Sequence, residues 1–162
     1  MSRLSCVTSG PDDTRSLGEA VAAQLRPGDV VSLSGELGAG KTCFVQGAAR
    51  GLGVTARVTS PTFTLVRPYD GDIGVVHVDV YRLNQLHEFE DLGDEVLDPE
   101  RVTFVEWGDA VARLLPPDRL EVELRWLEHD AQREVSFRCH GSWGARASSL
   151  TGSLAPWLQV EA

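Results

Sequence analysis

Apolar residues along the chain fall into short runs typical of strands and into one-sided patterns typical of helices. Strands are predicted over residues 3–8, 30–34, 57–66, 73–81, 102–105, 120–124 and 134–138. Helices are predicted over residues 14–25, 41–51, 87–97 and 110–115. A strand, loop and helix early in the chain, followed by paired strands, predict an α/β fold with a mixed sheet.

Turn and cap residues separate these elements. Asp12, Asp13 and Thr14 are typical of a helix cap, and predict that the first helix begins at residue 14. The turn Asp70-Gly71-Asp72 predicts that the strands on either side form an antiparallel hairpin. Residues 141–162 are small, polar and interrupted by tryptophan, and predict only a helix near residues 153–158. No repeat or linker divides the chain, so residues 1–162 are expected to form a single domain with this tail.

The composition is that of a globular protein. The 162 residues are 42% hydrophobic and 24% charged, with a net charge of −9 that disfavours direct binding of nucleic acid. No apolar run is long enough to span a membrane, and the N-terminus has no secretory signal, so a cytoplasmic location is expected. The 3 cysteines include no C-x-x-C pair, which disfavours a disulfide framework and a zinc site.

Residues 35–42, Gly-Glu-Leu-Gly-Ala-Gly-Lys-Thr, match the P-loop pattern G-x-x-x-x-G-K-[ST] between a predicted strand and helix. The glycines allow successive backbone N–H groups to surround an anion, and the helix N-terminus adds its positive dipole. Lys41, the only lysine among 15 basic residues, can bridge the β- and γ-phosphates, and the Thr42 hydroxyl can bind Mg²⁺. Nucleoside triphosphate binding is therefore predicted, and the lack of an N-K-x-D motif favours ATP over GTP. The predicted nucleotide-binding residues of the loop are Gly35, Leu37, Gly38, Ala39, Gly40, Lys41 and Thr42.

Two carboxylates, Asp79 and Glu106, each end an apolar strand, where phosphoryl chemistry needs an acidic group. The spacing leaves open which one contacts the metal and which orients a water molecule. Thr62 lies in the hydroxyl-rich segment 59–63 and is a candidate sensor of the γ-phosphate, although the residues alone favour a kink at a strand edge. Trp107 is either a core residue or a lid on the site.

Four motifs occur in order: the loop at 35–42, Ser-Pro-Thr-Phe at 60–63, His-Val-Asp-Val-Tyr-Arg-Leu at 77–83 and Glu-Trp at 106–107. Together they resemble the TsaE family (formerly YjeE) of bacterial tRNA threonylcarbamoyladenosine biosynthesis ATPases, over residues 11–138. The resemblance implies a P-loop fold whose central sheet is mixed and mostly parallel. It also implies an accessory ATPase, slow alone and stimulated by its partners TsaB and TsaD, which modify adenosine 37 of tRNAs reading codons that begin with A. Such a protein is not itself the transferase and meets tRNA only through the complex.

The resemblance also assigns roles to residues of this sequence. It implies that Thr42 and Glu106 bind Mg²⁺, and that Asp79 supports hydrolysis with Lys41. It favours Thr62 as the γ-phosphate sensor. It further implies that Trp107 lies beside the site and that the region of Thr14 lies near the adenine. Cys43 and Gly108 stand where family members often have Thr and Pro, and neither side chain is required by the expected chemistry.

Other functions remain open at this stage. A P-loop small-molecule kinase is the alternative enzyme, but the acidic segment 84–100 would make a poor lid over a phosphorylated product. A nucleotide sensor without hydrolysis would not need both carboxylates. The carboxylates between residues 88 and 100 are expected to form a solvated face, with a docking surface for a basic partner as the alternative.

Overall fold

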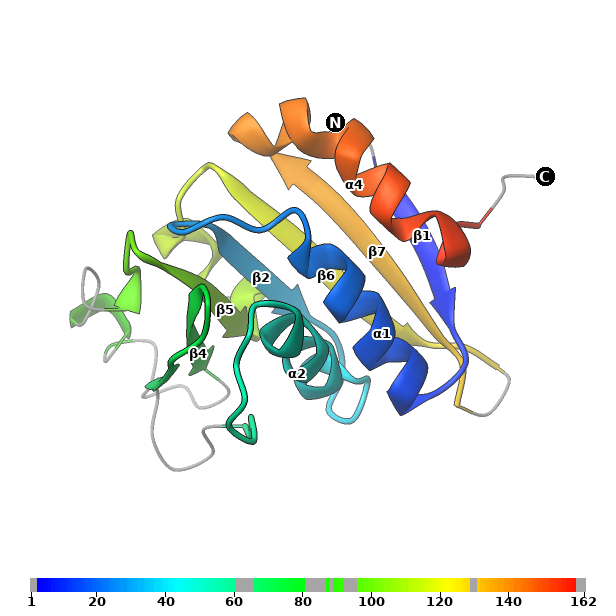
Figure 1. Cartoon of the computed structure of the whole chain (residues 1–162), viewed down its shortest axis with the longest axis horizontal. Coiled ribbons are helices and arrows are strands. Elements are labelled where there is room, and N and C mark those ends of the chain that lie inside the picture. Colours follow the sequence, from blue (N-terminus) through cyan, green and yellow to red (C-terminus); the bar gives the residue numbers. More distant parts are fainter. Residues whose placement is uncertain are drawn as a thin grey trace.

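The computed structural model of the chain describes residues 3–60, 66–80, 87, 89–91, 96–128 and 131–159. The helices lie against a twisted sheet that runs through the molecule (Figure 1). In chain order the helices, strands and 3₁₀ turns (η) are β1 (Arg3–Thr8), α1 (Pro11–Ala22), β2 (Val30–Ser34), α2 (Lys41–Gly51), β3 (Val66–Tyr69), β4 (Gly74–Asp79), β5 (Arg101–Glu106), η1 (Gly108–Leu114), β6 (Arg119–Trp126), β7 (Arg133–His140), η2 (Gly141–Arg146), α4 (Ala147–Leu154) and η3 (Ala155–Trp157).

The described strands form a seven-stranded sheet in the order β1-β7-β6-β2-β5-β4-β3. The central strands β6, β2, β5 and β4 are parallel, whereas β1, β7 and β3 run antiparallel to their neighbours. The expected mixed sheet with a mostly parallel centre is therefore confirmed, as is the hairpin after the first βα unit. In the register of β4 and β5, Asp79 lies opposite Glu106. The parallel arrangement thus brings the carboxyl ends of β2, β4 and β5 to one edge.

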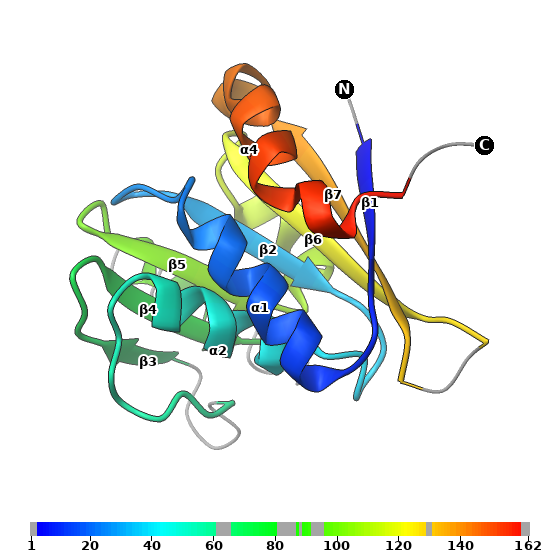
Figure 2. The same ribbon diagram turned by 45° about the vertical axis from the view of Figure 1, so that its right-hand side comes forward.

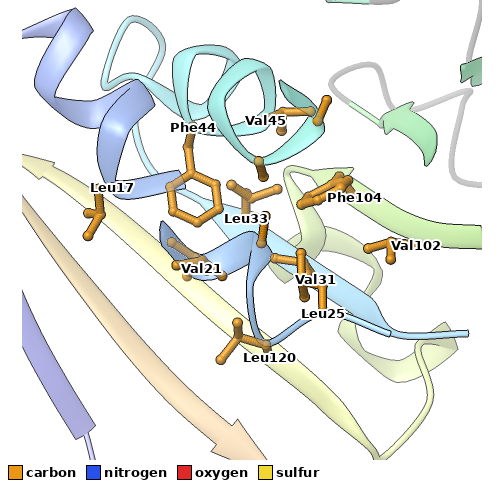
Figure 3. Packing of buried hydrophobic residues seen from close by; sticks show 14 of the residues in the cluster. Leu17, Val21, Leu25, Val31, Leu33, Phe44, Val45, Val102, Phe104 and Leu120 are labelled. Atoms are coloured by element: carbon orange, nitrogen blue, oxygen red, sulfur yellow. The ribbon is translucent and has the colours of Figure 1, made fainter. Parts of the chain in front are cut away.

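Apolar side chains fill both faces of the central sheet. Figure 2 shows α1 and α2 side by side on one face. There Leu17 and Val21 of α1 and Phe44 of α2 pack against Val31 and Leu33 of β2 (Figure 3). A smaller apolar cluster on the other face joins β2, β4 and β5 to η1. Because both faces are covered, the first four residues of β2 are buried, and apolar Val30, Val31 and Leu33 lie among them. Each fully buried large apolar side chain contributes roughly 1.5–3 kcal/mol.

Two glycines allow α1 and α2 to approach closely. A Cβ on Gly47 of α2 would lie 1.8 Å from the carbonyl oxygen of Arg15, and one on Gly18 of α1 would lie 2.3 Å from that of Phe44. The two backbones are therefore in direct contact at positions where no other residue fits. This contact fixes α2, and with it the loop that precedes α2.

Two predicted element boundaries and one predicted element type were wrong. Helix α1 begins at Pro11, three positions before the expected start, because Pro favours the first helical position. Asp13 lies within the first turn, where its carboxylate accepts a 2.8 Å hydrogen bond from the Ser9 N–H. The first hairpin strand begins at Val66 rather than at residue 57, since residues 57–60 form an irregular loop in which Val58 O accepts a hydrogen bond from Gln46. The short helix expected over 110–115 is instead the 3₁₀ turn η1.

The C-terminal segment packs into the main core. Its helix α4 ends where the expected helix at 153–158 was to begin, and the 3₁₀ turn η3 follows it. Trp143, Leu150 and Leu154 are buried against α1 and β7, an arrangement that the local sequence pattern did not indicate. Leu158 then forms a bridge to Cys6 of β1, so the segment also borders the sheet edge.

Described residues of the acidic segment contribute to the smaller apolar cluster. The described residues 87, 89–91 and 96 are helical, as predicted for 87–97. Phe89 and Val96 are buried in the smaller cluster, whereas Glu90 and Asp91 are exposed. Across the described ranges, no helix is both long enough and apolar enough to cross a membrane.

Candidate functional site

The loop between β2 and α2 depends on glycine for its conformation. Gly35, Gly38 and Gly40 have φ angles of +142°, +81° and +106°, a region that residues with a Cβ rarely adopt. Gly40 is the N-cap of α2, and no side chain caps the helix. The first N–H groups of α2 therefore have no acceptor within the helix and are oriented for an anion.

Lys41, the first residue of α2, is buried with its ammonium inside the loop. Its Nζ donates hydrogen bonds to the carbonyl oxygens of Gly35 (2.6 Å) and Glu36 (3.0 Å), and lies 4.0 Å from the centre of the Trp107 ring. Burial lowers the pKa of Lys41, against the opposing effect of the negative charges of Glu106 and Asp79. The ammonium is thus poorly hydrated and held beside two carboxylates, where an anionic ligand would stabilise it.

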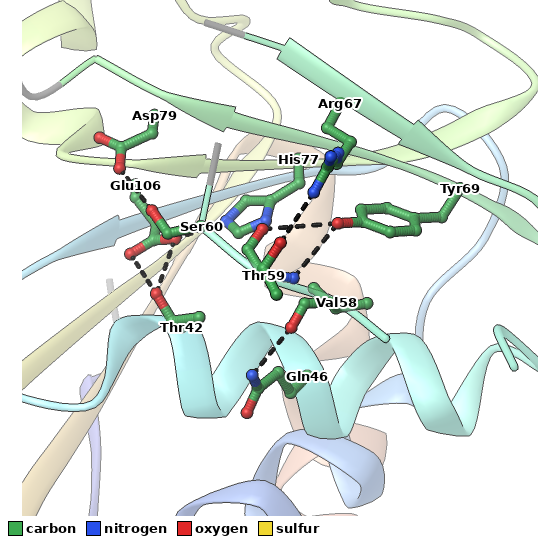
Figure 4. Close-up of polar contacts among 10 residues, drawn as sticks. All are labelled: Thr42, Gln46, Val58, Thr59, Ser60, Arg67, Tyr69, His77, Asp79 and Glu106. Atoms are coloured by element: carbon green, nitrogen blue, oxygen red, sulfur yellow. Dashed lines mark hydrogen bonds and ion pairs between the residues drawn. The ribbon is translucent and has the colours of Figure 1, made fainter. Parts of the chain in front are cut away.

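Thr42, Glu106 and His77 form a chain of polar contacts from α2 to the sheet (Figure 4). The Thr42 Oγ1 lies 3.1 Å from both carboxylate oxygens of Glu106, so the hydroxyl donates to this group. On the other side, His77 Nε2 lies 2.5 Å from Glu106 Oε2. Both Glu106 and His77 are buried, at 4% and 0% exposure.

Asp79 lies at the end of β4, opposite Glu106, and contacts the loop that leads from α2. Its Oδ2 accepts a 2.8 Å hydrogen bond from the hydroxyl of Ser60. The neighbouring Thr59 is held by the hairpin, since its N–H donates to the Tyr69 hydroxyl at 3.2 Å (Figure 4). Thr62 lies outside the described residues, so its role as a γ-phosphate sensor stays a prediction.

These groups meet at one cavity of about 440 Å³. The cavity is lined by Leu37, Gly38, Gly40, Lys41, Thr42, Cys43, Ser60, Asp79, Glu106 and Trp107. Its volume lies within the usual range for small-molecule sites. The hydroxyl of Thr42 and the carboxylate of Glu106 are hard oxygen donors, and Mg²⁺ is commonly held by one or two such groups together with substrate phosphates. The donor set therefore fits a magnesium ion that arrives with a nucleotide.

Thr14 lies beside the loop. It lines a smaller cavity of about 60 Å³ with Gly38, Gly40, Cys43 and Arg133, among other residues. The Thr14 hydroxyl is buried, and is hydrogen-bonded to the Thr8 hydroxyl (2.8 Å) and to the carbonyl oxygen of Gly10 (3.1 Å). Its hydroxyl is thus occupied by the protein, and only its aliphatic part is available to a ligand.

Sequence reasoning missed three groups around the site. His77 was part of a motif but had no role, although its position two residues before Asp79 places both side chains on one face of β4. Ser60 likewise had no role. Trp126, half exposed, lies near Gly38 and stacks on the guanidinium of Arg133 at 3.3 Å. No local pattern identifies that pair, because the antiparallel register of β6 and β7 brings it together.

Known proteins are similar in sequence to this chain over most of its length. The family model described as "Threonylcarbamoyl adenosine biosynthesis protein TsaE" matches residues 8–135. The chain is 42% identical over 144 residues to the tRNA threonylcarbamoyladenosine biosynthesis protein TsaE of Bacillus subtilis (strain 168), covering 88% of this chain and 89% of that protein. It is 47% identical over 125 residues to the protein of the same name from Streptomyces coelicolor (strain ATCC BAA-471 / A3(2) / M145), covering 75% and 84%.

A solved structure has a similar fold. The structure described as "Crystal structure of Bacillus subtilus YdiB" superimposes with a TM-score of 0.76 and 35% sequence identity. The match covers 96% of this chain and 95% of that chain. The likeness supports the α/β architecture described above.

Proposed function

The chain belongs to the TsaE family, and on this premise we propose that it serves the biosynthesis of threonylcarbamoyladenosine in tRNA as an accessory ATPase. One observation carries the nucleotide part of the proposal: Leu37, Gly38 and Gly40 of the P-loop line the same cavity as Lys41, the Thr42–Glu106 pair and Asp79. Because it would serve tRNA modification, we also propose a cytoplasmic location.

The loop and Lys41 would bind the phosphates. The N–H groups at the start of α2 donate to phosphate oxygens, and the glycines at 35, 38 and 40 leave room for close approach of the backbone. Lys41 would exchange its bonds to the carbonyl oxygens of Gly35 and Glu36 for bonds to phosphate oxygens, and its ammonium already lies inside the loop. The charge-assisted bonds gained are stronger than those to neutral carbonyls.

Thr42 and Glu106 would hold Mg²⁺ with the nucleotide. A bound magnesium ion supplies positive charge against the β- and γ-phosphates. The Thr42 hydroxyl contributes an oxygen from α2 and Glu106 contributes one from β5, and their 3.1 Å contact keeps the two groups together. The assignment of Glu106 to the metal follows the family resemblance, and its direct contact with Thr42 supports it.

Asp79 would orient the water molecule that attacks the γ-phosphate. Its carboxylate lines the cavity next to Glu106 and is bonded to Ser60, at the start of the segment that contains Thr62. A partner that displaced Ser60 would alter the position of Asp79, which gives partner proteins a physical means of changing the hydrolysis rate. We assign those partners as TsaB and TsaD, with transfer of the threonylcarbamoyl group carried out by them.

Release of phosphate from ATP–Mg²⁺ tests this function. The wild-type chain would be measured alone and with TsaB and TsaD, beside Lys41→Ala as control. Slow release alone, stimulation by the partners and loss of both in Lys41→Ala are expected. Binding of ATP without any effect of TsaB or TsaD on its hydrolysis would contradict the accessory role, and a search for a phosphate acceptor would follow.

A further inference from the structure

His77 is a fully buried polar residue beside the site that the proposed chemistry leaves without a role. It lies on β4 with 0% exposure, and its Nε2 is 2.5 Å from Glu106 Oε2 (Figure 4). Glu106 is at the same time the acceptor for the Thr42 hydroxyl. The histidine therefore contacts the same carboxylate that accepts the hydrogen bond from Thr42 of α2.

The proton arrangement on the His77 ring follows from its surroundings. Among the described residues, Nδ1 is buried and has no hydrogen-bond partner. A neutral imidazole has one N–H, and only at Nε2 does that N–H meet an acceptor, the Glu106 carboxylate. The ring thus donates from Nε2 to Glu106 Oε2.

We propose that His77 is a positioning residue that holds the Glu106 carboxylate in the orientation required to bind Mg²⁺ with Thr42. The inference rests on the proposed function, because it concerns the metal expected at Thr42 and Glu106. With Oε2 held by His77, rotation of the carboxylate is blocked, and an oxygen stays directed toward α2. Without this bond, a nearly buried carboxylate loses a charge-assisted partner and turns toward other donors.

Two amide variants separate a positioning role from a packing role. The amide nitrogen of His77→Gln reaches the place of Nε2 and can still donate to Glu106. In His77→Asn the shorter side chain brings its amide nitrogen only to the place of Nδ1, which has no partner among the described residues. Val75→Ala, a truncation on the same face of β4, serves as the control for loss of packing.

The measurement is the affinity for a fluorescent ATP analogue across a magnesium titration, repeated in EDTA. Loss of an outer partner of a metal ligand typically weakens metal binding by about 10–100-fold. The half-saturating Mg²⁺ concentration is therefore expected to rise about 10–100-fold in His77→Asn and to stay near the wild-type value in His77→Gln and Val75→Ala. Affinity in EDTA is expected to be the same in all four proteins.

Other results would overturn the inference. Equal magnesium dependence in His77→Asn and His77→Gln would show that the donor position does not matter. A parallel loss of affinity in EDTA would show that His77 only supports the fold of the site. If the wild-type chain binds no nucleotide with or without Mg²⁺, the proposed function fails and the inference fails with it, whereas normal wild-type binding with equal variants overturns the inference alone.

Discussion

Gly47→Ala is expected to destabilise the protein, although alanine is the better helix former. The new Cβ would lie 1.8 Å from the carbonyl oxygen of Arg15 and 2.6 and 2.7 Å from its carbonyl carbon and Cα. These are all backbone atoms of α1, so the clash is relieved only if the two helices separate. The substitution therefore tests whether α1 holds α2, and with it the P-loop, in place.

The expected magnitude follows from two opposing effects. Overpacking typically costs about 1–3 kcal/mol, and a contact this short with backbone lies at the upper end. The higher helix propensity of alanine offsets about 1 kcal/mol. The free energy of unfolding is thus expected to fall by about 2 kcal/mol, which for a chain of this size lowers Tm by about 4–8 °C.

Gly152→Ala in α4 is the matched control, since no atom lies within 4 Å of its new Cβ. Its free energy of unfolding is expected to rise by roughly 0.5–1 kcal/mol from helix propensity alone. Thermal and urea unfolding, followed by circular dichroism, would measure both variants. A Gly47→Ala variant as stable as Gly152→Ala would refute the close contact between α1 and α2.

Three further predictions concern the site and the N-terminal helix. Asp79→Ala is expected to bind ATP normally but to release phosphate about 10²-fold more slowly or worse, and unchanged turnover would show that Asp79 is not involved in hydrolysis. Thr42→Ser is expected to keep the magnesium dependence of ATP binding and Thr42→Ala to lose it; equal behaviour of the two would exclude the hydroxyl as a ligand. Burial raises the pKa of Asp13, but hydrogen bonds from Trp157 and Ser9 outweigh this effect and lower it overall. The stabilisation that ionised Asp13 gives is therefore present above the pKa of about 3.9 in the unfolded chain, and is lost as pH falls through the folded pKa. The difference in free energy of unfolding between wild type and Asp13→Asn, measured in urea, is expected to shrink on acidification. Growth of that difference would contradict the assignment.

Much of the central sheet and the P-loop could be predicted because each depends on local pattern. Strand β2 has three apolar residues among its five and lies between two buried faces, and the loop glycines are needed for left-handed backbone. Boundaries were less predictable where the deciding contact is distant. The irregular loop at residues 57–60, for example, is held by Gln46 and Tyr69 from other elements.

The same distinction applies to the candidate site. Lys41 and Thr42 are recognisable from one short motif, and the carboxylates from their places at strand ends. His77 becomes visible only when β4 and β5 are in register, because its partner Glu106 is distant in sequence. The C-terminal segment was unpredictable for a related reason: Trp143 and Leu150 are buried by α1 and β7 rather than by a pattern of their own.

Calorimetric titration of the chain with ATP in the presence of Mg²⁺ tests the central claim most directly, with Lys41→Ala measured in parallel. The account predicts that wild type binds one ATP per chain. It predicts that Lys41→Ala binds about 10–100-fold more weakly, since a hydrogen bond from a charged group contributes about 1.5–3 kcal/mol. Absence of ATP binding by the folded wild-type chain, or equal affinity in the two proteins, would contradict the assignment of this cavity as a nucleotide site.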